Sequence, residues 1–217
     1  MARLSARELA GAVKTNKYKG FGFLGGLKFN WRVHICPFDE ILPLIPEGVS
    51  LADIGCGSGL FVFLAAKTLS LDKILGLEIS GQLVKECRAM ARANGFGNLS
   101  AEEYDGSNPP PAARDFGVFT MIDVLHHIPR ESRRSYLENL YRSIPPGGRL
   151  ILKDIDADSP LVIFNKLHDL ALTGRLPSEP SARGLVALCA EIGFSVVLFR
   201  RVRRLVYPHF IIVLEKR

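Results

Sequence analysis

The sequence has few of the features that mark a membrane-spanning or secreted protein. No apolar run among its 217 residues approaches the roughly 18 residues that a spanning helix requires. The longest runs, such as Leu60–Ala66, are the size of a core helix. The N-terminal stretch also lacks the apolar region of a signal peptide. These absences predict a cytoplasmic protein with no transmembrane segment.

Cysteine is scarce, and its spacing gives no sign of a metal. The chain contains no C-x-x-C pair, so we expect no zinc site and no other metal site. In a cytoplasmic chain of this size, the cysteines are expected to be reduced and mainly buried. Repeats and low-complexity tracts are absent too, and a hydrophobic content of 47% predicts one ordinary globular core.

Basic residues outnumber acidic residues by a small margin. Lys and Arg total 28 against 22 Asp and Glu, and the resulting net charge of +6 can attract nucleic acid or anionic lipid. Much of the excess lies in two clusters, Arg3 to Lys28 and Arg200–Arg204. Short basic clusters are common and weakly specific, so we interpret both as solvated surfaces, one on an N-terminal helix and one on a hairpin.

Apolar strands alternate with amphipathic helices through most of the chain. Strand patterns at 50–54, 73–78, 98–104, 116–122 and 149–154 alternate with helical patterns at 58–69, 80–93 and 130–143. This alternation predicts an α/β, doubly wound, mostly parallel sheet covered on both faces. Two final strands at 194–201 and 208–215 have a short link, which favours an antiparallel last strand in a seven-stranded sheet.

Two segments fall outside this alternation: residues 1–47, and an insertion at about 155–180. Helical patterns occupy 4–16 and 30–45, whereas 17–29 is too rich in glycine for a regular helix. It is expected to be either a flap or a loop that packs its aromatic residues on the core. We expect 48–217 to form the cofactor-binding domain, with 1–47 covering its site and the insertion acting as a lid. Their apolar residues favour a hydrophobic or aromatic small acceptor, unless they only pack the lid: Tyr18, Phe21, Phe23, Phe29, Trp31, Leu161, Ile163, Phe164 and Leu167.

The most informative stretch is Leu51–Gly59, a buried strand that runs into a glycine-rich turn. Asp53 lies near the end of the strand, and Gly55, Gly57 and Gly59 alternate behind it. Glycine adopts positive φ at little cost and has no side chain, so a ligand can approach the backbone closely. The free N–H groups at the start of the following helix also point at such a ligand. The stretch therefore predicts a nucleotide-like cofactor site.

The glycine spacing separates the classes of cofactor. Nicotinamide dinucleotides favour G-x-G-x-x-G/A, but the last small position holds Leu60 or Val62, which disfavours an oxidoreductase. The Gly-Lys pair of a phosphate loop is also missing. An acid ahead of the glycines, Asp53, suits a ligand with a cationic head group, since it would repel a pyrophosphate.

Two further acids end the next two strands. Glu78 ends the second strand, where a carboxylate can accept both hydroxyls of a ribose. Asp105 ends the third strand and can accept a hydrogen bond from an adenine amino group. One acid at a strand end is usually a turn or cap residue, but three at successive strand ends favour a nucleoside site.

Together these motifs resemble the class I S-adenosylmethionine-dependent methyltransferases, in the small-molecule branch typified by ubiquinone biosynthesis. The resemblance covers about residues 48–215 and is carried by Leu51–Gly59, Leu75–Ser80, Asp115–Pro129 and Ile144–Asp154. It implies a Rossmann-like methyltransferase fold, S-adenosylmethionine as cofactor and S-adenosylhomocysteine as product. Two departures are Gly117, where the family often has Asp, and a loop around Pro109–Pro111 in place of the third helix.

The resemblance also implies a role for each motif. The methionine part of the cofactor would be held by the turn, the ribose and adenine by the next two strand ends, and the sulfonium by the end of the fourth strand. The residues implied for these three parts are, in turn, Asp53, Gly55, Cys56, Gly57 and Gly59; Glu78, Ile79, Asp105 and Gly106; and Ile122 and Asp123.

His126 and His127 follow the fourth strand and therefore fall near the methyl group. A phenol or carboxyl acceptor benefits from a general base with a pKa near neutral, and one of these histidines is the candidate. The competing interpretation is that the pair braces the turn. His168, in the insertion, is a second candidate that can equally face solvent.

Three functions are compatible with the motifs. The favoured one is O- or C-methylation of a small molecule. A nucleic-acid or protein methyltransferase gains support from the net charge and from Arg200–Arg204, but no N-P-P-[YF] signature follows the fourth strand, where Asp123–His127 stands instead. A catalytically inert cofactor-binding protein is the third. Steeply salt-dependent RNA binding would favour the second, and cofactor binding without turnover the third.

Overall fold

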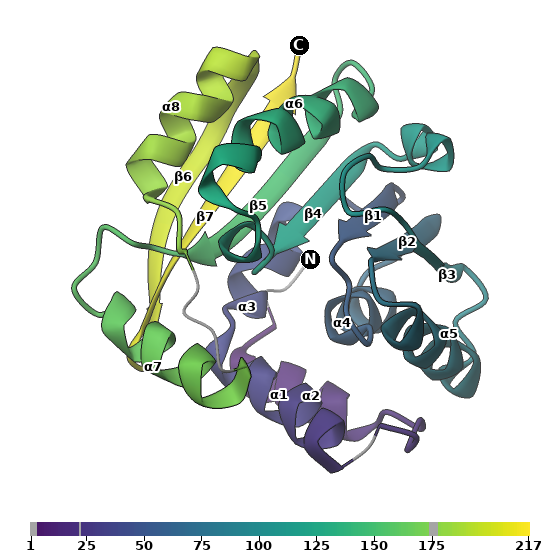
Figure 1. Ribbon diagram of the computed structural model, residues 1–217. Coiled ribbons are helices and arrows are strands. Elements are labelled where there is room, and N and C mark those ends of the chain that lie inside the picture. Colours follow the sequence, from purple (N-terminus) through teal and green to yellow (C-terminus); the bar gives the residue numbers. More distant parts are fainter. Residues whose placement is uncertain (1–3, 22, 174–177) are drawn as a thin grey trace.

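The computed structural model describes residues 4–21, 23–173 and 178–217, and these form a seven-stranded sheet (Figure 1). The strand order is β3-β2-β1-β4-β5-β7-β6, and β7 runs antiparallel to both of its neighbours. This confirms the predicted mostly parallel sheet with an antiparallel last strand. The strands are β1 Ser50–Ile54, β2 Lys73–Glu78, β3 Leu99–Glu103, β4 Val118–Ile122, β5 Arg149–Ile155, β6 Phe194–Arg204 and β7 Tyr207–Lys216.

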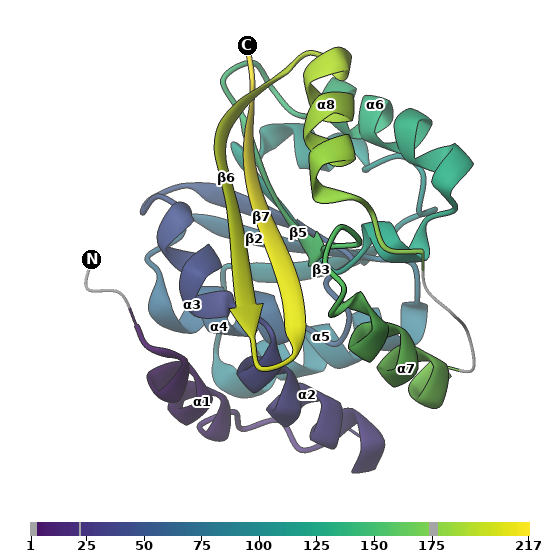
Figure 2. The ribbon, with the colours of Figure 1, turned by 90° about the vertical axis from the view of Figure 1, so that its left-hand side faces the viewer.

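Helices cover both faces of the sheet (Figures 1 and 2). One face carries α1 Ala6–Lys14, α2 Phe23–Ile35, α3 Phe38–Ile41, α4 Leu60–Thr68 and α5 Gly81–Asn94. The other carries α6 Arg133–Ser143 and α8 Ala182–Ile192, while α7 Val162–Thr173 contacts β7. Short 3₁₀ helices are η1 Leu42–Leu44, η2 Pro111–Asp115, η3 Leu125–His127 and η4 Arg130–Ser132. Within the described part of the chain, no helix has both the length and the apolar character needed to cross a bilayer.

Strand periodicity divides the buried side chains into two cores, one on each face. In β4, Val118 and Ile122 join the core under α4 and α5, whereas Phe119 and Met121 join the core under α6 and α8. Successive side chains of a strand point to opposite faces, so a strand buried on both sides is apolar throughout. The sheet therefore lies at the centre of a three-layer sandwich.

The helix boundaries follow local sequence signals. Ser80 caps the start of α5 by accepting a hydrogen bond from the N–H of Leu83, and Gly95 ends the helix with a φ of 74°. Ser5 and Glu8 form a capping box at the start of α1. A short polar side chain at the start and glycine just past the end satisfy backbone groups that the helix leaves unpaired.

The prediction of an irregular segment at 17–29 was wrong from Phe23 onward. Residues Phe23–Ile35 form α2, which includes Gly25 and Gly26. Phe29 and Val33 are both buried in the core, so tertiary packing outweighs the cost of two helical glycines. The loop predicted around Pro109–Pro111 likewise runs into η2, with Pro111 at its first position, where proline costs no hydrogen bond.

The basic cluster Arg200–Arg204 at the end of β6 is largely engaged in ion pairs. Arg204 pairs with Asp39 in α3, and Arg200 pairs with Glu40 beside it at 2.6 Å. Arg201 lies 2.7 Å from Asp156, just after β5. The cluster therefore joins the hairpin to the N-terminal helices and to the insertion.

Candidate active site

A cleft of about 770 Å³ opens at the carboxyl ends of the parallel strands, where the strand order reverses between β1 and β4. Ligands of doubly wound folds bind at this position. Most of the predicted site residues line it: Gly55, Gly57, Glu78, Ile79, Asp105, Gly106, Ile122, Asp123 and His127. Four others do not appear in its lining, namely Asp53, Cys56, Gly59 and His126.

The glycine turn is fixed against the end of β2. The N–H groups of Gly55 and Cys56 both donate to the carbonyl of Leu77, at 2.7 and 3.1 Å. A Cβ added at Gly55 would lie 2.5 Å from the Cγ2 of Val124, whereas one added at Gly57 would meet nothing within 4 Å. Gly55 therefore serves close packing, and Gly57 leaves backbone open to the cleft.

The carboxylate of Glu78 accepts hydrogen bonds from backbone N–H groups of the glycine turn and of the residues that follow β2. Its Oε2 accepts from the N–H of Gly57 at 2.9 Å, and its Oε1 accepts from Ile79 and Ser80 at 2.9 and 3.1 Å. Only 8% of the residue is exposed. This network fixes one orientation of the carboxylate and links the ends of β1 and β2 before any ligand binds.

Asp53 is buried beneath the turn rather than exposed in the cleft. Its Oδ1 accepts a hydrogen bond of 2.6 Å from the hydroxyl of Thr120 in β4. Burial raises the pKa of Asp53 to about 7, because desolvation disfavours the charged form. Its charge is therefore available to a cation at neutral pH and above.

Asp105 and Gly106 form a tight turn at one side of the cleft. The Oδ1 of Asp105 accepts from the N–H groups of Ser107 and Asn108, both at 2.8 Å. These backbone donors hold the pKa of Asp105 below its usual range. Gly106 has a φ of 77°, and a Cβ there would lie 3.0 Å from the Cγ2 of Ile79. Asp105 thus shapes a turn and lines the cleft.

Asp123 follows β4 with a φ of 58°, uncommon for a residue other than glycine. Its Oδ1 lies 2.5 Å from the Nζ of Lys153 in β5, and its Oδ2 lies 2.9 Å from Arg32 in α2. Burial alone would raise the pKa of Asp123, but the two cations outweigh burial and lower it. Asp123 therefore stays ionised and joins three separate elements.

Neither Lys153 nor Arg32 was among the predicted site residues. Lys153 is 1% exposed and directly follows the apolar run Leu150–Leu152 in β5, so a charged residue next to an apolar run was the available signal. Arg32 lies 91 residues from Asp123, and no local pattern links the two.

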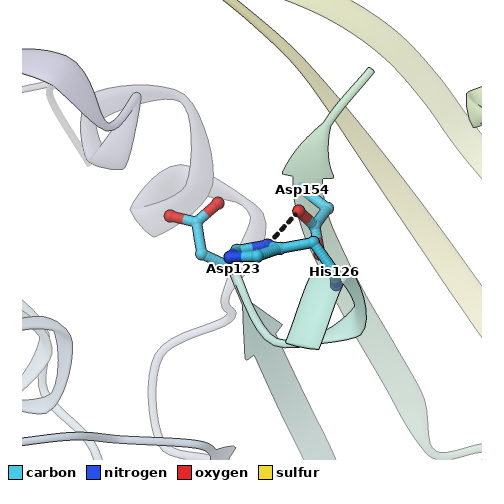
Figure 3. A group of neighbouring side chains, drawn as sticks. All are labelled: Asp123, His126 and Asp154. Carbon is cyan, nitrogen blue, oxygen red and sulfur yellow. Dashed lines mark hydrogen bonds and ion pairs between the residues drawn. The ribbon is translucent and has the colours of Figure 1, made fainter. Parts of the chain in front are cut away.

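The two histidines after β4 have different surroundings. The Nδ1 of His126 lies 2.7 Å from the Oδ1 of Asp154, and its side chain is buried (Figure 3). His127 lines the cleft, with its ring centre 4.0 Å from that of His126. The structure therefore brings one histidine to the cleft and directs the other to β5.

Asp123, His126 and Asp154 place one potential ligand atom each within 4.8 Å of one another (Figure 3). These atoms already have protein partners: Asp123 binds Lys153 and Arg32, while His126 binds Asp154. A divalent cation there would also face the Lys153 ammonium at close range, which is electrostatically unfavourable. We assign no metal to this group.

Comparison with known proteins relates this chain to methyltransferases. A family model described as a methyltransferase domain matches residues 51–148. The chain is 30% identical to the O-methyltransferase resE of Aspergillus sclerotiorum over 165 residues, 74% of this chain and 60% of the relative. It is also 30% identical to the tRNA U34 carboxymethyltransferase of Desulfotalea psychrophila over 153 residues, 68% of this chain and 46% of that one.

In fold, the chain resembles a SAM dependent methyltransferase from Aquifex aeolicus, with a TM-score of 0.69 and 15% identity over 96% of this chain and 98% of that one. Residues 51–148 therefore form a methyltransferase domain, and the chain has the fold of S-adenosylmethionine-dependent methyltransferases. The chain spans less than two thirds of the length of the two relatives described above.

Two tyrosines that sequence reasoning missed also line the cleft. The hydroxyl groups of Tyr104 and Tyr136 lie 3.1 Å apart, and burial raises the pKa of both. Both phenols therefore remain neutral and present aromatic surface beside Glu78 and Asp105.

The segments expected to surround the acceptor contribute little to the cleft. Among the described residues of 15–38 and 155–180, Arg32 lines it. Phe29 is buried near Phe63, whereas Trp31 and Phe164 are exposed to solvent. The side chains of Phe23 and His168 lie outside the described residues.

Proposed function

We propose that this protein transfers the methyl group of S-adenosylmethionine to an oxygen or carbon of a small hydrophobic or aromatic acceptor. The observation that carries the proposal is the continuity of one cleft. It runs from Glu78 and Asp105, which suit a nucleoside, to Asp123 and His127 beyond β4. Glu78 and Asp105 would hold the nucleoside of such a cofactor, and Asp123 and His127 would lie on the side of the cleft where the methyl group is transferred.

Each group of side chains and backbone atoms at the cleft suits one part of this cofactor. The carboxylate of Glu78 suits the ribose hydroxyls, while Ile79, Asp105 and Gly106 suit the adenine. The turn at Gly55, Cys56, Gly57 and Gly59, with Asp53 beneath it, suits the methionine part and its cationic ammonium. Ile122 and Asp123 then face the sulfonium. When bound, S-adenosylmethionine supplies an electrophilic methyl group, and the protein holds the acceptor in line with it.

Within this proposal the two histidines have separate roles. His127 lines the cleft and accepts the proton that a hydroxyl or carboxyl acceptor loses as its oxygen attacks the methyl carbon. His126 holds the loop in position, since its Nδ1 is paired with Asp154 and its side chain is buried. Residues 1–47 and the lid at 155–180 are proposed to border the acceptor side.

A second candidate is methylation of RNA, which the tRNA-modifying relative supports. The charge of Arg200–Arg204 gives it little support, because Arg200, Arg201 and Arg204 pair with acidic groups of the same chain. Steeply salt-dependent binding of RNA would favour this candidate over a small acceptor.

The direct test is isothermal titration with S-adenosylmethionine, with NAD as the control ligand. We expect binding of S-adenosylmethionine alone, and binding of NAD alone would reject the proposal. Transfer from radiolabelled cofactor is then screened across phenols, carboxylic acids and quinone precursors. Cofactor binding without turnover on any of them, or on RNA, would favour an inert cofactor-binding protein.

A further inference from the structure

The net charge of this protein is confined to its N-terminal segment. Residues 1–35 contain seven Lys and Arg and one Glu, whereas residues 36–217 contain 21 Lys and Arg and 21 Asp and Glu. The whole net charge of +6 therefore lies in 1–35. Arg7, Lys14 and Lys17 are exposed, and within the described residues none of them forms an ion pair. This basic segment presents uncompensated charge to the surroundings.

Exposed apolar side chains gather on α2, within that segment, and on α7. Leu27 and Trp31 lie four residues apart on α2, with 59% and 52% of their surfaces exposed. A helix of a globular protein normally buries its apolar stripe, but α7 leaves much of its own exposed. We call the following six residues the apolar face: Leu27, Trp31, Ile163, Phe164, Leu167 and Leu170.

The helices α2 and α7 lie close together at one end of the molecule in both views (Figures 1 and 2). This is the end toward which β4 and β5 point, and the cleft opens at these carboxyl ends. Arg32, next to Trp31 in α2, lines the cleft. The apolar face, the basic segment and the cleft therefore share one end of the protein.

We propose that the apolar face and the basic segment dock this protein on the surface of an anionic phospholipid bilayer. Aromatic and aliphatic side chains enter the boundary between headgroups and acyl chains, and neighbouring lysines and arginines contact the anionic headgroups. Tryptophan favours this interface because one part of its ring is apolar and the other donates a hydrogen bond. Docking in this orientation gives the cleft access to an acceptor dissolved in the bilayer.

The composition of α2 favours lipid over a protein partner as the occupant. The helix carries Lys28 and Arg32 but no acidic residue, so its charge is of one sign. The anionic groups of a bilayer are mobile and adjust to such a surface without a matching shape. An acidic protein is the competing occupant, and the test below separates the two.

Trp31 is the only tryptophan of the chain, so its fluorescence reports directly on the apolar face. The probe is a vesicle of mixed phosphatidylglycerol and phosphatidylcholine, with pure phosphatidylcholine vesicles as the control. We expect a blue shift of Trp31 emission and co-sedimentation with the anionic vesicles alone, both weakening as salt is raised. The assay requires neither cofactor nor acceptor, so its outcome is independent of the proposed methyl transfer.

Substitutions on the apolar face have matched controls elsewhere on the surface. Changing Phe164→Glu together with Leu167→Glu is expected to weaken binding to the anionic vesicles at least about tenfold, because each change places a charge at the acyl boundary. The control pair is Val197→Glu with Phe199→Glu on β6, where both side chains are exposed and outside the apolar face. The control pair should bind as the wild type does.

The basic segment is tested in the same way. Lys14→Glu with Lys17→Glu should weaken vesicle binding about tenfold or more, while the exposed Lys73→Glu with Lys85→Glu should leave it nearly unchanged. Titration with S-adenosylmethionine or a melting curve verifies that each variant is folded. Unchanged Trp31 emission, equal binding to neutral vesicles, or equal losses in test and control variants would overturn the proposal. Binding to an acidic protein without vesicle binding would assign the surface to that partner instead.

Discussion

The two ends of the cleft are built in different ways. At the end proposed to hold the nucleoside, here called the nucleoside end, Glu78 is fixed by the N–H groups of Gly57, Ile79 and Ser80, all within 21 positions of it along the chain. At the opposite end, Asp123 is fixed by Arg32 and Lys153, which are 91 and 30 positions away. Backbone donors position the first carboxylate, whereas side-chain charges from other elements position the second.

This difference affects how well each end of the cleft tolerates amino-acid substitution. Backbone donors are present whatever the side chains, so the nucleoside end depends mainly on the turn keeping its shape. The Asp123 end depends on two particular cations, and a buried carboxylate that loses its partner is costly. Substitutions at the first end should therefore change ligand binding, and substitutions at the second should change folding as well.

The largest expected effect is on cofactor binding at the nucleoside end. Glu78→Ala removes the proposed acceptor for two ribose hydroxyls, and hydrogen bonds to a charged group contribute about 1.5–3 kcal/mol each. We expect the dissociation constant for S-adenosylmethionine to rise at least about 100-fold, measured by titration calorimetry. Glu103→Ala, at the exposed end of β3, is the matched control. Wild-type affinity in the Glu78 variant would place the ribose elsewhere.

The next effect separates the two histidines. His127→Ala is expected to lower kcat about 100-fold or more on a hydroxyl or carboxyl acceptor, with cofactor affinity unchanged, because it removes the proposed general base. His126→Ala should instead lower the free energy of unfolding by about 2 kcal/mol, since Asp154 loses a buried partner. Turnover and urea denaturation measure the two effects. The opposite result, with catalysis depending on His126 alone, would reverse the assignment.

The third effect tests the charge pairs of Asp123. Lys153→Met leaves a largely buried carboxylate with one cation, and we expect the free energy of unfolding to fall by about 3 kcal/mol. The side chain of Arg32 is 42% exposed, so Arg32→Met should cost at most about 1 kcal/mol. Lys85→Met, on the surface of α5, is the control. Similar costs for all three variants in urea denaturation would contradict the comparison between the two ends.

The smallest effect concerns pH and Asp53. Its pKa in the empty protein is about 7, against 3.8 for an ordinary aspartate, so the folded state binds this proton more tightly than the unfolded chain. The contribution of Asp53 to the free energy of unfolding is therefore greatest below pH 3.8 and is lost as pH rises through about 7.

Cofactor binding should show the opposite trend, because a cationic ligand needs the ionised carboxylate. Below about pH 7, the dissociation constant should rise up to about tenfold per pH unit, and binding should release a proton. Titration in buffers of different ionisation enthalpy measures that proton. Asp53→Asn should bind weakly at all pH values and release none. A wild-type affinity that does not change between pH 6 and 8 would show that Asp53 does not titrate with the ligand.

Much of the sheet and part of the site followed from local patterns. Strand β1 begins and ends where its apolar run predicted, and Gly95 ends α5 as its conformational freedom predicted. The helix α2 was missed because the burial of Phe29 and Val33, which only the packed core provides, outweighs the low helix propensity of its glycines. The residues next to His126 and His127 in the sequence did not indicate which of the two histidines would reach the cleft.

The sequence by itself determined the succession of strands along the chain, the glycine turn and the acids at or near the ends of successive strands. Those features depend on side-chain periodicity and on backbone conformation, which act over a few residues. Only the tertiary structure decided that Arg32 and Lys153 meet at Asp123, that His126 turns inward, and that the apolar face lies outward. Burial and charge pairing depend on what packs beside a residue, and its neighbours along the chain do not specify that.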